Sequence, residues 1–207
     1  MTTELEKTIV LPEAKWPDTF VGVFQLEDTV HCLNVIDYAE QSPDRMQPSL
    51  ILEGDATVGP NIKTRDSQQV DYSPRCYPVC HKEILEFADG CLQTYMEKLP
   101  ESANFPAFNV EETYSVLKYN KGQAYHGVHT DYVPFIEHLD RRHLTFVMFL
   151  NSVAEGGELE FVNQDLRIRP EEGKAVIFPS GWTHSHRTWP PNETRYVLQL
   201  WWSFLRK

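Results

Sequence analysis

The sequence has no apolar run long enough to cross a membrane and no secretory leader. Its start, MTTELEKTIVLPEAKWPD, lacks both the basic residues and the continuous apolar stretch of a signal peptide. A transmembrane helix needs about 20 predominantly apolar residues, and no later segment reaches that length. We therefore expect a cytoplasmic protein without a membrane partner.

Basic residues are also scarce. The 207 residues include 19 Lys and Arg against 30 Asp and Glu, which gives a formal net charge of -11. A protein with this balance lacks the polycationic surface that binds nucleic-acid phosphates. We therefore expect no nucleic-acid partner.

Cysteine is rare, which argues against a disulfide framework. Cys32, Cys76, Cys80 and Cys91 all lie in the first half of the chain, and in a reducing compartment they remain thiols. Cys76 and Cys80, followed by His81, could form half of a zinc site, but no second matching pair is present. Free thiols are the interpretation that we adopt.

The sequence does contain enough apolar residues to build a folded domain. Hydrophobic residues make up 41% and charged residues 24% of the chain, the usual mixture for a globular protein. We expect one domain over residues 1–207, with a helical or irregular support at 1–112 and a β-rich core at 113–207. The segment 42–78, rich in Pro, Asp, Gly and Ser, predicts irregular structure or short edge strands.

Two segments of the first half show the spacing of amphipathic helices. They are Glu27–Gln41, which begins with two acidic residues that favour a helix N-terminus, and His81–Leu99. We expect each helix to pack one apolar face against the core. These faces are Val30, Leu33, Ile36 and Ala39 in the first helix, and Ile84, Ala88, Cys91, Leu92 and Tyr95 in the second.

From Thr113 onward, short β-rich runs alternate with turn signals such as Gly156-Gly157. Such runs without an intervening helix predict a mainly β fold, a double-sheet jelly roll on which the two helices pack. The predicted strands are Tyr114–Tyr119, Tyr125–Thr130, Leu144–Leu150, Glu158–Val162, Leu166–Ile168, Ala175–Phe178, Thr183–Arg187 and Arg195–Phe204.

A possible metal site begins with His129 and Asp131. On an extended strand these two side chains project from the same face. A distant histidine would complete a two-histidine, one-carboxylate triad, which suits non-haem iron(II) and leaves three coordination positions open. His184 and His186 share strand parity, so position alone allows either. Arg195, on the next predicted strand, could bind a carboxylate through both oxygens.

The order of these residues resembles a known family. The segment from Tyr119 to Trp201 is similar to the prolyl 4-hydroxylase-like branch of the 2-oxoglutarate/Fe(II)-dependent dioxygenases. That family has a tyrosine ahead of His-x-Asp, a Gly-Gly strand entry, and a final stretch with His, Pro, a basic residue and Trp. The corresponding residues are Tyr119, His129, Asp131, Gly156–Phe161, His186, Pro190, Arg195-Tyr196 and Trp201.

The resemblance implies roles for these residues within a double-stranded β-helix. It selects His186, rather than His184, as the third metal ligand, and Arg195 as the anchor of 2-oxoglutarate. Tyr119 would donate its hydroxyl to the same carboxylate. Where some members have a tyrosine before Leu-Asn, this chain has Phe149. Thr145, on the same strand face, is a candidate replacement donor.

The resemblance also implies the reaction. Fe(II), 2-oxoglutarate and dioxygen would act together, with ascorbate as a candidate reductant, to hydroxylate an unactivated C–H bond and release succinate and CO2. The substrate class implied is a prolyl residue or a related amino acid, in a peptide or free. Asp131 favours hydroxylation, because related halogenases have a small residue at that position.

Two alternatives remain open. The chain could be a non-catalytic jelly roll that binds a metal or a small acid, or a dioxygenase acting on another small molecule. Nucleobase demethylation is disfavoured, because enzymes of that type carry a further arginine in the last strand, and none lies between Arg195 and Trp201.

Trp201, Tyr125 and Tyr132 are candidate residues of a substrate cleft. Residues 1–110 show no pattern that indicates a substrate or an oligomeric state.

Overall fold

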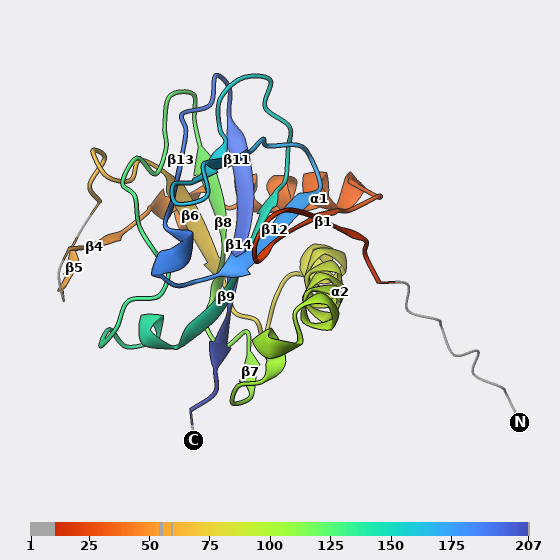
Figure 1. The fold of residues 1–207 in the computed structure, drawn as a ribbon. Coiled ribbons are helices and arrows are strands. Elements are labelled where there is room, and N and C mark those ends of the chain that lie inside the picture. Colours follow the sequence, from red (N-terminus) through yellow and green to blue (C-terminus); the bar gives the residue numbers. More distant parts are fainter. Residues whose placement is uncertain (1–10, 54–55, 59, 207) are drawn as a thin grey trace, which may run out of the picture.

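The computed structural model describes residues 11–53, 56–58 and 60–206, and it shows a mainly β protein with two long helices on one side (Figure 1). The strands are β1 (Ala14–Asp18), β2 (Val21–Gln25), β3 (Gln47–Pro48), β4 (Ile51–Glu53), β5 (Ala56–Val58), β6 (Gln68–Tyr72), β7 (Phe108–Asn109), β8 (Tyr114–Tyr119), β9 (Arg142–Phe149), β10 (Leu159–Phe161), β11 (Leu166–Ile168), β12 (Lys174–Pro179), β13 (His186–Thr188) and β14 (Arg195–Phe204). The helices are α1 (Val30–Glu40) and α2 (Lys82–Lys98), with short 3-10 turns at Pro43–Arg45, Val79–His81, Pro100–Ala103, Leu139–Arg141 and Trp182–His184.

The strands form one large sheet and two small ones. The large sheet has the order β1-β2-β12-β9-β14-β8-β6-β3, with β7 paired to the far end of β14. A three-stranded sheet, β11-β10-β13, and the β4-β5 hairpin are separate, and all ladders are antiparallel. The central strands β12, β9, β14 and β8 are those that the sequence predicted for a jelly roll.

The two faces of the large sheet bury two different cores. Along β9, Leu144, Phe146 and Met148 point to the core shared with the helices, whereas Val147 and Phe149 point to the core shared with β10 and β11. Alternation with period two is the strand geometry that produces this division. The second face therefore carries the residues that can line an internal site.

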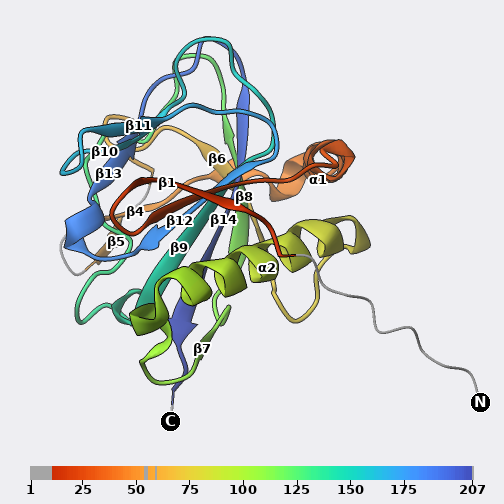
Figure 2. The same ribbon diagram turned by 45° about the vertical axis from the view of Figure 1, so that its right-hand side comes forward.

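Both helices lie on the first face (Figure 2). In α2 the buried residues are Ile84, Ala88, Cys91 and Tyr95, four of the five that formed the predicted face. No helix in the described ranges is both long and apolar enough to span a bilayer.

The apolar face predicted for the first helix is wrong. Val30 and Leu33 are 49% and 51% exposed, whereas Cys32, Val35 and Ala39 are buried. The buried set also has helical spacing, so α1 offers two apolar stripes that overlap at Ala39. Packing against the sheet selects the stripe with the smaller side chains.

The expectation of a helical or irregular support at residues 1–112 is corrected by strands at its N-terminal end. β1 and β2, which the sequence did not predict, extend the large sheet beyond β12, whereas β6 and β3, short strands within 42–78 as expected there, extend it beyond β8. The N-terminal half therefore covers both edges of the β core. Residues 1–10, which belonged to the predicted support, lie outside the described residues.

Two predicted strands are not regular strands. Residues 125–130 form a loop in which the strand-like pairings are two isolated bridges, Arg65 with Tyr125 and His129 with His186. In place of a strand over 183–187, a 3-10 turn, Trp182–His184, precedes β13. At Gly127 a Cβ atom would lie 2.8 Å from Thr64 Cγ2, so this loop approaches its neighbour more closely than other residues allow.

Candidate active site

The structure brings His129, Asp131 and His186 into one group. One ligand atom of each residue lies within 4.8 Å of those of the other two, and no other such group of metal-ligating residues occurs in residues 11–53, 56–58 and 60–206. The backbones of His129 and His186 form a reciprocal pair of hydrogen bonds, 3.0 and 2.9 Å long. Asp131 is held by its N–H, which donates to the Ser180 carbonyl at 3.2 Å. The isolated bridge thus supplies the positioning that we expected from a strand.

Hydrogen bonds fix the orientation of both imidazoles. His129 Nδ1 lies 3.0 Å from the Gly127 carbonyl, and His186 Nδ1 lies 2.9 Å from the His184 carbonyl. A carbonyl only accepts, so each Nδ1 carries the proton and each Nε2 has a free lone pair. Burial lowers the pKa of His129 and keeps its ring neutral. Both rings are therefore ready to bind a metal.

The carboxylate of Asp131 is buried and remains ionised. Burial by itself would raise its pKa, but the charges of His186, His129 and Arg142 and a hydrogen bond from Thr145 lower it overall. The Thr145 hydroxyl lies 2.8 Å from both Asp131 Oδ2 and the Ser180 hydroxyl. The structure therefore engages Thr145 with Asp131, away from Arg195.

His184 points away from this group. Its Nε2 lies 3.2 Å from the carbonyl of Thr19, and its Nδ1 lies 2.9 Å from the Thr183 hydroxyl. It belongs to the 3-10 turn, so the strand parity that made it equivalent to His186 does not apply. His186 Nε2, by contrast, lies 3.8 Å from Asp131 Oδ2.

Arg195 is completely buried on β14 and lies directly across the ladder from Tyr119 on β8. Its guanidinium lies 4.2 Å above the Tyr119 ring, and Nη1 donates to the Gly157 carbonyl. Gly157 has φ +75°, and a Cβ there would lie 3.3 Å from Arg195 Cδ. The Gly156-Gly157 turn that precedes β10 therefore leaves space for the Arg195 side chain.

Two donors of this guanidinium have no partner. Arg195 Nε and Nη2 are buried and unpaired among the described residues. Burial lowers the pKa of Arg195 from its usual value, but a guanidinium stays charged in proteins. A buried donor without an acceptor costs about 1–3 kcal/mol, and a carboxylate would satisfy both donors at once.

A narrow inner cavity of about 30 Å³ connects Arg195 with the metal-ligating group. His129, His186, Tyr119 and Arg195 line it, and every lining residue falls within residues 117–199. The two histidines and one carboxylate form a donor set that suits ferrous iron. The unpaired N–H groups at the other end suit a carboxylate. The residues present therefore fit iron and a dicarboxylate that reaches from the metal to Arg195.

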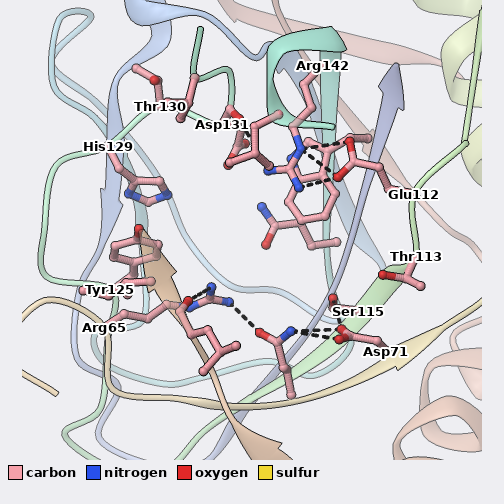
Figure 3. Close-up of a pocket in the computed structure, with 17 residues that line it drawn as sticks. Arg65, Asp71, Glu112, Thr113, Ser115, Tyr125, His129, Thr130, Asp131 and Arg142 are labelled. Atoms are coloured by element: carbon pink, nitrogen blue, oxygen red, sulfur yellow. Dashed lines mark hydrogen bonds and ion pairs between the residues drawn. The ribbon is translucent and has the colours of Figure 1, made fainter. Parts of the chain in front are cut away.

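A larger cleft of about 430 Å³ opens on the other side of the metal-ligating group (Figure 3). Tyr125 stacks on His129 with ring centroids 3.6 Å apart, and the Arg65 guanidinium lies 5.2 Å from the Tyr125 ring. Trp201 and Tyr125 line this cleft, as the sequence suggested, but Tyr132 is not among its lining residues.

Sequence reasoning missed the charged residues of the outer cleft. Arg142 donates to Glu112 at 3.0 Å and lies 3.5 Å over the Trp201 ring. Arg65 and Asp71 come from the Pro- and Asp-rich segment that we expected to form irregular structure or short edge strands. No periodicity or spacing marks these residues, because strands that are distant in sequence bring them together.

Residues 114–203 match the family model of the 2OG-Fe(II) oxygenase superfamily. This match covers the C-terminal part of the chain, somewhat less than half of its 207 residues. The chain is also similar to a prolyl 4-hydroxylase. It is 29% identical over 129 residues to prolyl 4-hydroxylase 13 of Arabidopsis thaliana, an alignment that spans 51% of this chain and 46% of that protein.

Solved structures of prolyl hydroxylases share the fold. A viral collagen prolyl hydroxylase from Paramecium bursaria Chlorella virus-1, in a 2-oxoglutarate complex, aligns with a TM-score of 0.66 at 17% identity, over 90% of this chain and 97% of that one. A Pseudomonas putida prolyl-4-hydroxylase gives 0.65 at 20% identity, over 89% and 92%. A Trichoplax adhaerens prolyl hydroxylase, bound to a hypoxia inducible factor peptide fragment, gives 0.66 at 16% identity, over 89% and 83%.

Proposed function

We propose that the chain is an Fe(II)- and 2-oxoglutarate-dependent dioxygenase that hydroxylates an unactivated C–H bond of a prolyl residue or a related amino-acid substrate. The observation that carries this proposal is the buried Arg195, with two unpaired donors facing a cavity whose other end holds two metal-ready histidines. A structural arginine would have its donors satisfied by the protein. The similarity to prolyl 4-hydroxylases supports the same substrate class.

Each residue has a defined task in this proposal. His129 and His186 offer Nε2 and Asp131 offers a carboxylate oxygen to the iron, while Arg195 holds the distal carboxylate of 2-oxoglutarate. Tyr119 supports the guanidinium from below and offers its hydroxyl to the same carboxylate. When bound, iron and 2-oxoglutarate supply the oxidative chemistry, in which dioxygen gives one oxygen atom to the substrate carbon and one to succinate, with loss of CO2.

The remaining site residues orient and shield. The hydrogen bond from Thr145 holds Asp131 Oδ2 in place. Apolar walls formed by Leu117, Val147 and Phe149 keep water from the inner cavity. No side chain needs to act as a general base, so the protein contributes ligation, orientation and the exclusion of water.

We further propose that residues 1–207 act as one domain in the cytoplasm, with 2-oxoglutarate and a peptide or free amino acid as partners and without nucleic acid or membrane. The large sheet, to which both halves of the chain contribute strands, supports the single domain. The net charge of -11 supports the absence of a nucleic-acid partner.

The test is a reaction with Fe(II), 2-oxoglutarate and ascorbate, in which succinate is measured and a panel of proline-containing peptides and free amino acids is screened for the mass gain of one oxygen. We expect succinate in every reaction with active protein and a mass gain with at least one member of the panel. Saturable 2-oxoglutarate binding without any succinate would instead support a non-catalytic binding protein. Succinate with no mass gain in the panel would move the substrate to another class of small molecule.

A further inference from the structure

One wall of the outer cleft comes from outside the segment that matches the superfamily, since seven of its 17 lining residues precede residue 114. Arg65, Gln69, Asp71 and Glu112 all line the cleft, and all precede residue 114, where the matched segment begins. The inner cavity has no such contribution. Features that this chain does not share with the whole superfamily should therefore be found on this wall.

Of the five Asp, Glu and Arg residues that line the cleft, Glu112 and Arg142 neutralise each other. Glu112 accepts hydrogen bonds from Arg142 Nε at 3.0 and 3.1 Å, and Asp131 belongs to the metal-ligating group. Arg65 and Asp71 remain. Within the described residues, neither of them has an ion-pair partner within 4.0 Å. The cleft thus contains one free cation and one free anion among its described residues.

Asp71 is fixed in place by neutral donors. Its Oδ1 accepts hydrogen bonds from the Ser115 hydroxyl at 2.6 Å and from Gln69 Nε2 at 2.9 Å. The nearby Arg45 donates to the backbone carbonyl of Asp71, at 3.4 Å, and not to its carboxylate. These hydrogen bonds orient the carboxylate toward the cleft but leave its charge uncompensated (Figure 3).

Arg65 lies on the metal side of the same wall. It donates to the side chains of Ser67 and Gln69, at 3.3 and 3.2 Å, and stacks over Tyr125. The Gln69 amide therefore connects the guanidinium, through its oxygen, with the carboxylate of Asp71, through its nitrogen. Along the cleft the positive Arg65 lies beside Tyr125, which stacks on His129, and the negative Asp71 lies farther from His129 (Figure 3).

We propose that this cleft selects a substrate that carries a positively charged group, an ammonium or a guanidinium, on the side of the target carbon that faces Asp71. The proposal rests on the proposed function. Asp71 is exposed, so water and salt screen part of its charge, but its hydrogen bonds hold the carboxylate where it lines the cleft, and the net charge of -11 adds a long-range attraction for a cation. Arg65 repels a cation at the metal side, so the charge order also defines which end of the substrate is positive.

The test uses acetylated, amidated five-residue peptides with a central proline and otherwise neutral residues. Lysine, acetyl-lysine or glutamate is placed in turn at each other position. Binding to the protein loaded with Fe(II) and 2-oxoglutarate is measured without oxygen, and hydroxylation is then followed by mass. At one or more positions on one side of the proline, the peptide with lysine should bind about five- to tenfold more tightly than the peptide with acetyl-lysine. This difference in affinity should shrink with added salt.

The variant Asp71→Asn should reduce the lysine advantage to less than about twofold. Asp37→Asn, a change at an exposed position of α1 away from the cleft, is the matched control and should retain the advantage. Free L-lysine and L-proline form a further arm. Asp71-dependent binding of these compounds alone would assign the positive group to a free amino acid rather than to a peptide side chain.

Three results would overturn the proposal: peptides that bind without a lysine advantage, an advantage that survives Asp71→Asn, or a preference for the glutamate peptides. Absence of binding by all probes, the free amino acids included, would count against it as well. Failure of the proposed function looks different, because the wild type would then form no succinate. Normal succinate formation without charge selection would therefore reject only the role of Asp71.

Discussion

The inner cavity and the outer cleft meet at the same metal-ligating side chains but are built from different parts of the chain. His129 lines both spaces, whereas His186 lines the inner cavity and Asp131 the outer cleft. The inner cavity, lined by residues 117–199, is narrow and has one guanidinium at its end. The outer cleft is more than ten times larger, is lined by acidic and basic residues, and draws on residues 50–113 as well.

This division matches two different requirements. A co-substrate that is the same in every reaction needs one rigid anion site, and in the proposed function this site is Arg195 with Tyr119, which lie opposite each other in the β8–β14 ladder. A substrate that differs between enzymes needs a wall that can change without disturbing that ladder. Strand β6 and the residues before it form such a wall. The division therefore predicts which substitutions affect co-substrate binding and which affect substrate choice.

The largest effect is expected at the boundary between the two spaces. His129→Ala, Asp131→Ala and His186→Ala should each reduce iron-dependent succinate formation to background, because two remaining protein ligands hold the metal weakly and in the wrong orientation. His184→Ala is the matched control, and it should retain bound iron and measurable activity. The reverse pattern for the two histidines would show that the ligand assignment is incorrect.

A smaller effect, limited to 2-oxoglutarate binding in the inner cavity, is expected from substitutions of Arg195. Arg195→Ala should weaken 2-oxoglutarate binding by about 2–5 kcal/mol, much of it from leaving the carboxylate unpaired, and lysine should rescue only partly because it lacks the planar fork. Titration of 2-oxoglutarate into the oxygen-free iron protein, followed by its charge-transfer band, measures this change. Arg187→Ala, at a half-exposed arginine paired with Glu160, is the control. Equal affinity in wild type and Arg195→Ala would place the anchor elsewhere.

The third effect concerns the stability of the N-terminal half that forms the outer wall. His81 is fully buried beside Tyr72 of β6, and burial, with a contribution from the charge of Arg45, lowers its pKa to about 4. In the unfolded chain His81 has an ordinary pKa near 6.5. Between pH about 4 and about 6.5 the unfolded chain therefore binds more protons than the folded protein. The free energy of unfolding should therefore fall by about 3 kcal/mol as the pH drops from about 6.5 to about 4, with no further loss from this group below that.

Denaturant unfolding at several pH values tests this effect. His81→Gln should flatten the dependence in that window whatever its absolute stability, whereas His126→Gln, at an exposed histidine, should leave the slope as in the wild type. A His81→Gln slope equal to that of the wild type would show that other groups control acid stability.

The smallest effect is expected at Tyr119. Tyr119→Phe removes the hydroxyl offered to 2-oxoglutarate but keeps the ring beneath Arg195, so co-substrate binding should weaken by about 0.5–1.5 kcal/mol. Tyr119→Leu, which also removes the ring, should cost more because the contact between guanidinium and ring is lost. The same charge-transfer titration compares the two variants. Identical affinities for Tyr119→Phe and wild type would limit Tyr119 to supporting Arg195.

The sequence predicted the inner part of the site well. Strands β8 and β14 have the predicted bounds, Tyr119 and Arg195 face each other across them, and His186 rather than His184 joins Asp131. Apolar alternation and the ordered motif determine these features locally. Thr145 was placed on the correct strand, but which group its hydroxyl would contact depended on Ser180 and Asp131, which come from other segments.

The outer part could not be predicted in the same way. Strands β1, β2 and β6 are short and lie in or near segments rich in turn residues, so their pairing depends on the edges that β12 and β8 offer. The buried face of α1 was misassigned because two apolar stripes compete and tertiary packing selects one. Arg65 and Asp71 become neighbours of the metal-ligating group only once β6 has paired with β8.

The N-terminal strands have a consequence for the behaviour of any shortened chain. A fragment beginning at Tyr114 would retain every residue assigned to iron and 2-oxoglutarate, yet it would lose the partners of Ala175 and Val176 on β12 and of Val116 on β8. Unpaired strand edges of this kind readily pair with other chains. Such a fragment should therefore aggregate during folding, so in addition to shaping the cleft the first half of the protein protects the second half from self-association.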